Sequence, residues 1–377
     1  MAEILMKILR VITKIKVGGV EVGLLEEIKL ILKMDGIRYY IVVLEGEGDS
    51  CFSELNSMIK QEFTQDEADK VQILYLNSSV SKLLFNFSKF YFFLKNIKPD
   101  FVISSLWKSH FIILPFRIFF PIVKRNQFVP FFHSSSYAHS TDKFVSKLAY
   151  TFSQKQIYDS FSTKSLYNNN NNNNNNSDVV MFNFNSNYSG EIVENSIPYK
   201  FVFVGRLHAV KNIPRSLLFL STLRDLGVSF IFNVYGPDEG ELTKLIELVS
   251  QLKLTESVFF HGSIKPELTA NVLSEHDFIL QTSEREGMAA SVLQAMQLGV
   301  VPIVTPVGQI PSYCKDGENS FFVRSECDDK KIFTKIFSLY DDGVMLNFRK
   351  NVQKSVYNIP TFEEGFKTIL TGKFKSQ

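Results

Sequence analysis

The sequence predicts an α/β fold made of two Rossmann-like domains, each with its own parallel sheet. Short β-branched or aromatic runs alternate with longer helical patterns from end to end, which is typical of βαβ units. The same alternation starts again at Lys200, after a run of asparagines at 168–176. The length of 377 residues exceeds one ordinary core and fits two domains of roughly 150 to 200 residues.

The first domain, expected over residues 1–190, begins with a strand, a helix and a second strand. The strand is expected at 7–13 (KILRVIT), and apolar residues then recur at helical spacing from Leu24 to Leu32. Asp35-Gly36 stops this helix. The remaining strands of the domain are expected at 38–44, 71–76, 101–104, 128–132 and 178–184.

The second domain, expected over residues 191–360, begins with the strand KFVFVG at 200–205. Four further strands are expected near Phe230, Phe259, Ile279 and Ile303. The asparagine run at 168–176 offers no apolar area to offset the entropy of ordering it, so we expect a mobile surface loop there. Residues 361–377 are expected to form a tail that packs back on the first domain.

Charge and cysteine content exclude several classes of protein. Lys and Arg number 41 against 39 Asp and Glu, a net charge of +2, which argues against a nucleic-acid partner. Three cysteines are too few and too scattered for a disulfide scaffold or a zinc site with CxxC spacing. The six histidines lack spacing that suits metal ligation, so we predict no metal site and no cofactor.

We expect neither secretion nor a membrane-spanning segment. The N-terminal residues show no leader pattern, and the most apolar window, 111–123, is interrupted by Pro115, Arg117 and Pro121. We therefore expect a cytoplasmic protein.

Two Rossmann-like domains are expected to bind ligands in a cleft at the carboxyl ends of their strands, so the loops after strands are the candidate sites. After the first strand, Gly18 and Gly19 come just before a helix, where backbone amides can approach a phosphate. The alternative is a plain turn. After the strand at 200–205, Arg206 and Lys211 could neutralise a diphosphate, or they could be solvated loop cations.

A third candidate segment follows the strand near Ile279. Glu286 and Gly287 are expected to open a helix, and Gln294 lies eight residues later, roughly 12 Å along the axis if both residues are helical. That separation suits contact with two parts of one elongated ligand. Alternatively, an acidic residue at a helix start simply complements the helix dipole.

These motifs, taken in order, resemble a group 1, family 4 glycosyltransferase of the GT-B fold. The order is GGVE, then GRLxxxKN, then SxxEGMxxSxxQAMxxGxxPIV, then VGQIPSYCKDGENSFFV. The resemblance extends over residues 7–323 and is densest between 201 and 323.

The resemblance implies a role for each matching residue. Gly18, Gly19, Arg206 and Lys211 would contact the donor diphosphate, and Glu286 would bind hydroxyls of the donor sugar. The remaining donor contacts are expected from Gly287, Met288, Ala289 and Gln294, and from backbone near Gly262 and Ile264. His133, at the end of an aromatic strand, would lie near the transferred sugar; the alternative is a structural histidine whose hydrogen bonds are satisfied within the fold. The predicted catalytic set is His133, Glu286, Arg206 and Lys211.

Two positions depart from the family pattern. Gln294 stands where a glutamate is usual, so one acceptor oxygen for the ribose hydroxyls becomes a donor NH₂. Ser320 stands where a glycine is usual, and positive-φ backbone there would cost about 1 kcal/mol more.

The resemblance also implies a mechanism that retains anomeric configuration. When the bond between the anomeric carbon and the diphosphate breaks, negative charge develops on the phosphate. Fixed cations and backbone amides can stabilise this charge without a metal. No carboxylate stands out as a nucleophile, so same-face attack is favoured, with the leaving phosphate oxygen accepting the proton.

The acceptor is expected to be a lipid-linked or cell-envelope glycan of the lipopolysaccharide, O-antigen or capsule type. Residues 82–125 hold eight basic residues against one acid, Asp100, interleaved with many aromatic residues. This combination suits an anionic membrane surface and predicts a peripheral position on the inner face of the cytoplasmic membrane. The alternative to membrane binding is a basic face that is simply solvated.

The alternatives to a glycosyltransferase are a nucleotide-sugar epimerase of the same architecture and a catalytically degenerate nucleotide-sugar-binding scaffold.

Overall fold

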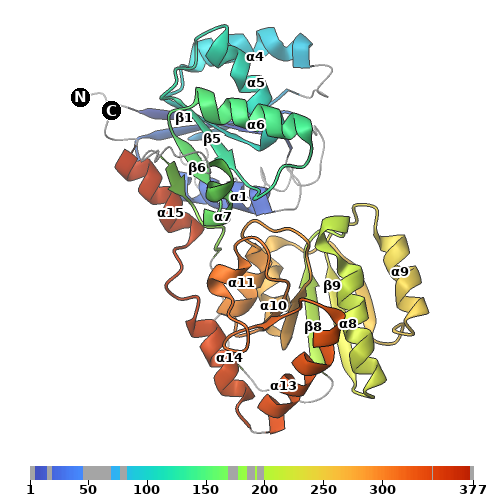
Figure 1. Cartoon of the computed structure of the whole chain (residues 1–377). Coiled ribbons are helices and arrows are strands. Elements are labelled where there is room, and N and C mark those ends of the chain that lie inside the picture. The colour runs from blue at the N-terminus through green and yellow to red at the C-terminus, as the bar shows by residue number, and fades with distance from the viewer. Residues whose placement is uncertain are drawn as a thin grey trace. The chain divides into compact units, whose positions relative to one another are not determined.

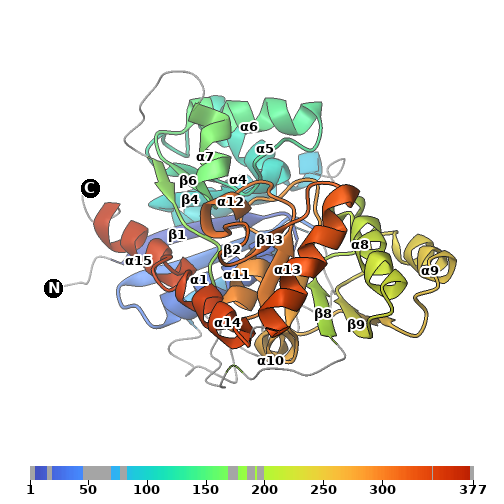
Figure 2. The same ribbon diagram turned by 60° about the horizontal axis from the view of Figure 1, so that its bottom comes forward.

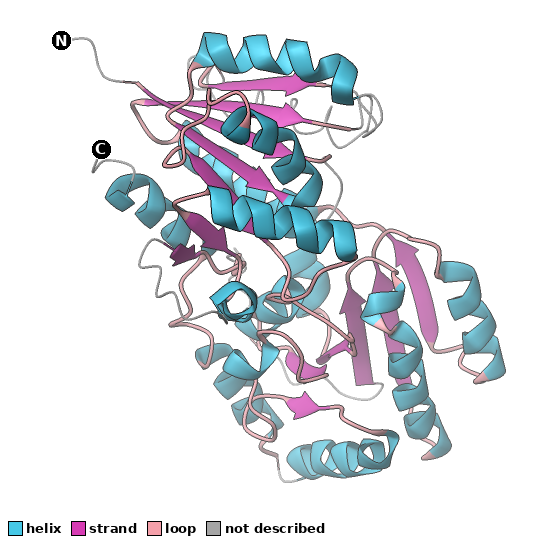
Figure 3. Cartoon of the chain, turned by 45° about the horizontal axis from the view of Figure 1, so that its top comes forward, coloured by secondary structure: helices cyan, strands magenta, loops and turns pink. Residues whose placement is uncertain are grey.

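The computed structural model describes residues 5–14, 19–45, 69–76, 83–168, 177–184, 192, 199–341 and 343–373. The chain forms two compact units, one made of Met1–Met181 with Phe362–Gln377 and the other of Phe182–Thr361. The expected domain boundary at 190 and the loop at 168–176, apart from Asn168, lie outside the described residues. Figure 3 shows in each unit a sheet of strands flanked by helices.

The first unit contains a seven-stranded sheet in the order β3-β2-β1-β4-β5-β6-β7, with every pairing parallel. The chain therefore reverses its direction of sheet growth between β1 and β4. The strands are β1 (Met6–Ile12), β2 (Ile37–Val43), β3 (Val71–Tyr75), β4 (Phe101–Ser105), β5 (Phe128–Phe132), β6 (Gln156–Tyr158) and β7 (Ser177–Val179).

Helices cover the first sheet, as parallel strands require for burial on both faces. The C-terminal helix α15 belongs to this unit and packs against α1 (Figure 1). The helices are α1 (Gly19–Leu32), α4 (Leu83–Ile97), α5 (Leu106–Ile118), α6 (Ser140–Phe152), α7 (Phe161–Asn168), α15 (Phe362–Thr368) and the π-helical turn η5 (Ile369–Lys373).

The second unit contains a six-stranded parallel sheet in the order β10-β9-β8-β11-β12-β13. Its switch point lies between β8 and β11. The strands are β8 (Tyr199–Val204), β9 (Phe230–Tyr235), β10 (Val258–Gly262), β11 (Phe278–Gln281), β12 (Val301–Val304) and β13 (Phe321–Phe322).

The helices of the second unit follow each strand in turn, and α13 packs beside α8 (Figure 2). They are η2 (Ala209–Lys211), α8 (Ile213–Asp225), α9 (Leu242–Gln251), η3 (Pro266–Leu268), α10 (Thr269–Ser274), α11 (Ala290–Gln297), α12 (Ile310–Tyr313), η4 (Glu326–Asp328), α13 (Asp329–Asp341) and α14 (Met345–Lys354).

Both sheets confirm the predicted α/β class with two Rossmann-like domains. One expected strand, 178–184, is wrong beyond Val179, where β7 ends. The reason is local. The Asn183 side chain donates to the carbonyl of Ile359 and accepts from Gln297, so this stretch is bound to the second unit and cannot continue the first sheet.

Candidate active site

An ion pair lies at the carboxyl edge of the second sheet, at its switch point. The strands β8 and β11 are neighbours there, and their connections leave in opposite directions. Ligands of doubly wound sheets bind at this kind of edge. Lys211 ends the short helix η2 after β8, and Glu286 lies in the loop after β11.

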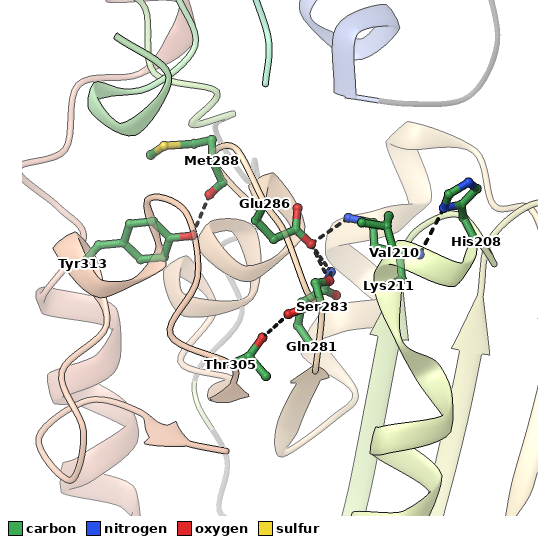
Figure 4. A network of polar contacts seen from close by, with 9 residues as sticks. All are labelled: His208, Val210, Lys211, Gln281, Ser283, Glu286, Met288, Thr305 and Tyr313. Atoms are coloured by element: carbon green, nitrogen blue, oxygen red, sulfur yellow. Dashed lines mark hydrogen bonds and ion pairs between the residues drawn. The ribbon is translucent and has the colours of Figure 1, made fainter. Parts of the chain in front are cut away.

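Lys211 and Glu286 form a largely buried ion pair at this edge (Figure 4). The Nζ atom of Lys211 lies 2.7 Å from Oε1 of Glu286, and the side chains are 16% and 8% exposed. Burial alone would raise the pKa of Glu286, but the Lys211 charge and hydrogen bonds from neighbouring side chains outweigh it and lower that pKa. Glu286 is therefore an ionised carboxylate at neutral pH.

Two polar side chains near the end of β11 hold the Glu286 carboxylate. Gln281 Nε2 donates to Oε1 at 2.7 Å, and Ser283 Oγ donates to the same oxygen at 2.6 Å. The backbone oxygen of Ser283 in turn accepts from Thr305, which follows β12. Neither Gln281 nor Ser283 was among the predicted site residues, although they lie only five and three residues before Glu286 in the sequence.

The loops after β8 and β11 are tied together by backbone contacts as well. Glu284 N donates to the carbonyl of Val210 at 2.9 Å, and Thr282 Oγ1 donates to the carbonyl of Asn212 at 2.8 Å. His208 caps η2 by accepting from Val210 N. Because these bonds bracket Lys211 and Glu286, the ion pair is held by backbone as well as by side chains.

The loop after β11 differs from the prediction at one point. Glu286 and Gly287 do not open the helix; α11 begins at Ala290. Ala289, the residue before it, has left-handed backbone with φ of 51°, which interrupts helical geometry. The estimate of 12 Å along one helix axis between Glu286 and Gln294 is therefore wrong.

The other donor residues predicted on this loop lie close to its backbone supports. Met288 and Ala289 are buried, and the Met288 carbonyl accepts from the Tyr313 hydroxyl at 2.6 Å. The Gly287 carbonyl accepts from Gln309 N at 3.0 Å. Gln294 lies within α11, is half-buried, and its side chain makes no hydrogen bond to the described residues.

Arg206 does not join the Lys211–Glu286 pair. Its Nη1 atom lies 2.9 Å from Oε2 of Glu239, which follows β9. Two further predicted donor residues, Gly262 and Ile264, lie at the end of β10 and in the loop after it. Gly262 has φ of 72° and is exposed, whereas Ile264 is half-buried.

In the first unit, His133 follows β5 directly, as predicted. Its Nε2 atom lies 2.5 Å from Ser105 Oγ at the end of β4, and its ring centroid lies 4.1 Å from that of Phe131. Burial, followed by the charges of Arg10 and His110, lowers the pKa of His133 well below its ordinary value. Gly19 is the first residue of α1, and Gly18 lies outside the described residues.

A buried ionic network lies beneath this edge of the first sheet, and the predicted site did not include it. Arg10, in the central strand β1, is fully buried and its Nε lies 2.8 Å from Oε2 of Glu27 on α1. The Tyr39 hydroxyl donates to the same oxygen. Arg10 also lies over the Phe131 ring, 5.6 Å from its centroid. One arginine within a buried apolar strand is the sequence signal that could have located it.

Among the described residues, no group of three or more His, Cys, Asp or Glu side chains could hold a metal ion. Within the same ranges, no helix has the length and apolar character needed to span a bilayer.

The switch point of a doubly wound sheet is where such folds bind ligands, and in the second unit it holds an ionised carboxylate and a cation. Residues 185–358 match the family described as Glycosyl transferases group 1. This segment, a little under half of the chain, is similar to the group 1 glycosyltransferases.

Known proteins are similar to this chain in sequence or in fold. The N-acetyl-alpha-D-glucosaminyl L-malate synthase of Bacillus anthracis is 29% identical over 120 residues, a match that spans 32% of this chain and only 31% of that protein. The crystal structure of Anabaena HepE in complex with UDP-glucose is 16% identical, covers 97% of this chain and 99% of its own, and has a TM-score of 0.73.

A further structure, the apo form of the lipopolysaccharide outer core galactosyltransferase WaaB, is 15% identical with a TM-score of 0.68. It covers 98% of this chain and 100% of its own. At these identities the two structures establish the fold, which is the GT-B fold expected from the sequence.

Proposed function

We propose that this protein transfers a sugar from a nucleotide-diphosphate sugar to an acceptor. The observation that carries the proposal is the Lys211–Glu286 pair at the β8/β11 switch point, in the segment that matches the family. Lys211 would neutralise the diphosphate, and the ionised Glu286 carboxylate would accept hydrogen bonds from sugar hydroxyls. HepE, which binds UDP-glucose, supports a donor of this chemistry.

Donor binding is tested by thermal unfolding with UDP, GDP, ADP and their glucose conjugates. A ligand at 100 times its Kd should stabilise the protein by about 2.7 kcal/mol. Lys211→Ala should abolish this stabilisation. The matched control is Lys244→Ala, because Lys244 forms an exposed pair with Glu241 on α9 and should leave binding intact. If no nucleotide stabilises the wild type, the proposal fails.

The finer parts of the proposal concern stereochemistry and metal. We propose retention of anomeric configuration without a metal, with the departing phosphate oxygen accepting the acceptor's proton. Lys211 and Arg206 would then stabilise the charge that develops on the diphosphate. An NMR spectrum of the product that showed an inverted anomer, or loss of turnover in EDTA, would contradict this part.

The acceptor is proposed to be a lipid-linked or cell-envelope glycan, and the protein to bind the cytoplasmic membrane from its inner face. The lipopolysaccharide galactosyltransferase WaaB supports an acceptor of this class. On α4, Phe92 is 60% exposed between the exposed Lys89 and Lys95. The centroid of the Tyr91 ring lies 5.5 Å from that of Phe92 and 6.5 Å from that of Phe120. Because Phe120 follows α5, the second contact connects α4 with the end of α5.

Membrane binding is tested with vesicles rich in phosphatidylglycerol. The double variant Phe92→Ser/Phe120→Ser should lose co-sedimentation, because it removes the exposed rings that would enter the interface. Phe144→Ser is the control, since Phe144 is at least as exposed as Phe92 and Phe120 but lies on α6. Binding to neutral vesicles with the same affinity would contradict the role of the basic residues.

A further inference from the structure

Glu239 faces the cation that we expect to bind the donor diphosphate. Its two carboxylate oxygens lie 3.2 and 2.9 Å from the same nitrogen, Nη1 of Arg206. Within the described residues, the Nη2 and Nε atoms of Arg206 donate no hydrogen bond, so that edge of the guanidinium is available to a ligand.

Backbone contacts hold Glu239 in this position. Glu239 N donates to the carbonyl of Leu207 at 3.1 Å, and Leu207 N donates to the carbonyl of Pro237 at 2.9 Å. A Cβ on Gly236 would approach the carbonyl oxygen of Gly205 to 1.7 Å, so the loops after β8 and β9 touch backbone to backbone. The backbone contacts between these two loops therefore place the Glu239 backbone beside Arg206.

Asp238, which precedes Glu239, holds the residues of the same loop that follow Glu239. Its Oδ1 accepts from the backbone nitrogens of Gly240, Glu241 and Leu242 at 2.8 to 3.1 Å. One of these bonds comes from Leu242, the first residue of α9, whereas the Glu239 carboxylate contacts Arg206.

The two ion pairs at this edge of the second sheet differ in burial. The side chains of Arg206 and Glu239 are 47% and 27% exposed, against 16% and 8% for Lys211 and Glu286. Removing one partner of a buried pair is costly because a charge is left uncompensated. An exposed pair is weak because water screens it. A dianionic ligand can therefore displace Glu239 from Arg206 far more easily than it can displace Glu286 from Lys211.

We propose that Glu239 is a positioning residue that lowers the affinity of the site for nucleoside diphosphates and so favours release of the product. This inference rests on the proposed function. The carboxylate neutralises Arg206 in the absence of ligand, and its negative charge opposes a bound diphosphate nearby. When the product leaves, Arg206 pairs with Glu239 again, so the guanidinium charge is not left uncompensated.

The test is the dissociation constant of UDP, GDP and ADP, measured by calorimetry on the full chain. Glu239→Gln, which keeps shape and removes charge, should bind the preferred diphosphate about 2- to 5-fold more tightly than the wild type. The gain should shrink at 1 M salt, where exposed charges are screened. Glu239→Asp, with charge kept on a shorter arm, should fall between the two.

A matched control and a check on the site accompany these variants. Glu241→Gln makes the same charge change two residues away, on a carboxylate that contacts Lys244 at 3.0 Å, and should leave the affinity unchanged. Arg206→Ala should weaken diphosphate binding, which verifies that the ligand reaches Arg206.

Three results would overturn the inference. If Glu239→Gln binds no more tightly than the wild type while Arg206→Ala binds more weakly, the inference fails and the proposed function stands. A gain of equal size in Glu241→Gln would show a general charge effect and would also overturn it. If the wild type binds none of the three diphosphates, the proposed function fails and the inference fails with it.

Discussion

Gly308 lies directly against the carbonyl oxygen of Glu286. A Cβ built on Gly308 would approach that oxygen to 2.0 Å and the Gly287 carbonyl oxygen to 3.0 Å. Gly308 also has left-handed backbone, with φ of 58°. The loop after β12 therefore supports the loop that carries the ionised carboxylate, and the contact requires a residue without a side chain.

We expect Gly308→Ala to displace Glu286 and to remove nucleotide-dependent thermal stabilisation. Strain in left-handed backbone costs about 1 kcal/mol, and the clash with the Glu286 carbonyl adds to it. Gly343→Ala is the matched control, because Gly343 has φ of 66° and nothing within 4 Å of a Cβ. Equal losses of unfolding free energy in the two variants would show that the contact with Glu286 contributes nothing.

The Lys211–Glu286 pair should dominate local stability at the switch point. We expect Lys211→Met to lower the free energy of unfolding by about 2 to 4 kcal/mol, because it leaves the Glu286 carboxylate buried without its cation. The double variant Lys211→Met/Glu286→Gln should lose less than the sum of the two single losses, since no uncompensated charge remains. Urea unfolding of the four proteins measures this coupling.

Acid should remove the same contribution. The pKa of Glu286 is lowered in the folded protein, so the pair stabilises above the ordinary glutamate pKa and loses its effect as pH falls through the lowered value. Lys211→Met should therefore flatten the acid limb of stability against pH. An identical acid limb in the variant and the wild type would contradict the lowered pKa.

Much of the fold could be predicted from the sequence because buried parallel strands appear as continuous runs of apolar residues. The strand expected at 128–132 coincides with β5, and those at 7–13 and 38–44 differ from β1 and β2 by one residue at each end. The short strands β6 and β13 were not predicted. They span three and two residues, which is too short for a run or an alternation of apolar residues to be recognised.

The candidate site was predictable only where a residue type carries the chemistry. Lys211 and Glu286 were selected separately, and the structure joins them at 2.7 Å. Gln281 and Glu239 were missed because an amide at the end of a strand and an acid in a loop are common. Their importance depends on which strands are neighbours, and the order β9-β8-β11 is a property of topology that no local pattern records.

The buried Arg10–Glu27 pair gives a prediction about the first unit. Glu27→Ala should lower the free energy of unfolding by about 3 to 5 kcal/mol, because the fully buried guanidinium loses its carboxylate. Glu26→Ala is the control on the same helix, since the Glu26–Lys29 pair is about one-third exposed and should cost under about 1 kcal/mol. If Glu27→Ala costs no more than Glu26→Ala, the network does not stabilise the sheet.

His110 should make stability depend on pH in the mildly acidic range. It is buried on α5 with Nδ1 2.7 Å from Ser104 Oγ, and burial together with the Arg10 charge lowers its pKa from 6.5 to about 3. Between these two values the unfolded chain binds a proton that the folded protein excludes, so stability must fall as pH decreases. The loss attributable to His110 should reach about 2 kcal/mol at pH 5 relative to pH 7.5.

The comparison of wild type with His110→Asn isolates this effect. Asparagine does not titrate and can still contact Ser104, so the variant should lose less stability than the wild type between pH 7.5 and pH 5, whatever its stability at neutral pH. Part of the slope should remain, because burial and Arg10 also lower the pKa of His133. Urea unfolding at both pH values measures the difference. Parallel losses in the two proteins would mean that His110 takes up its proton in the folded state as readily as in the unfolded chain, which would contradict the lowered pKa.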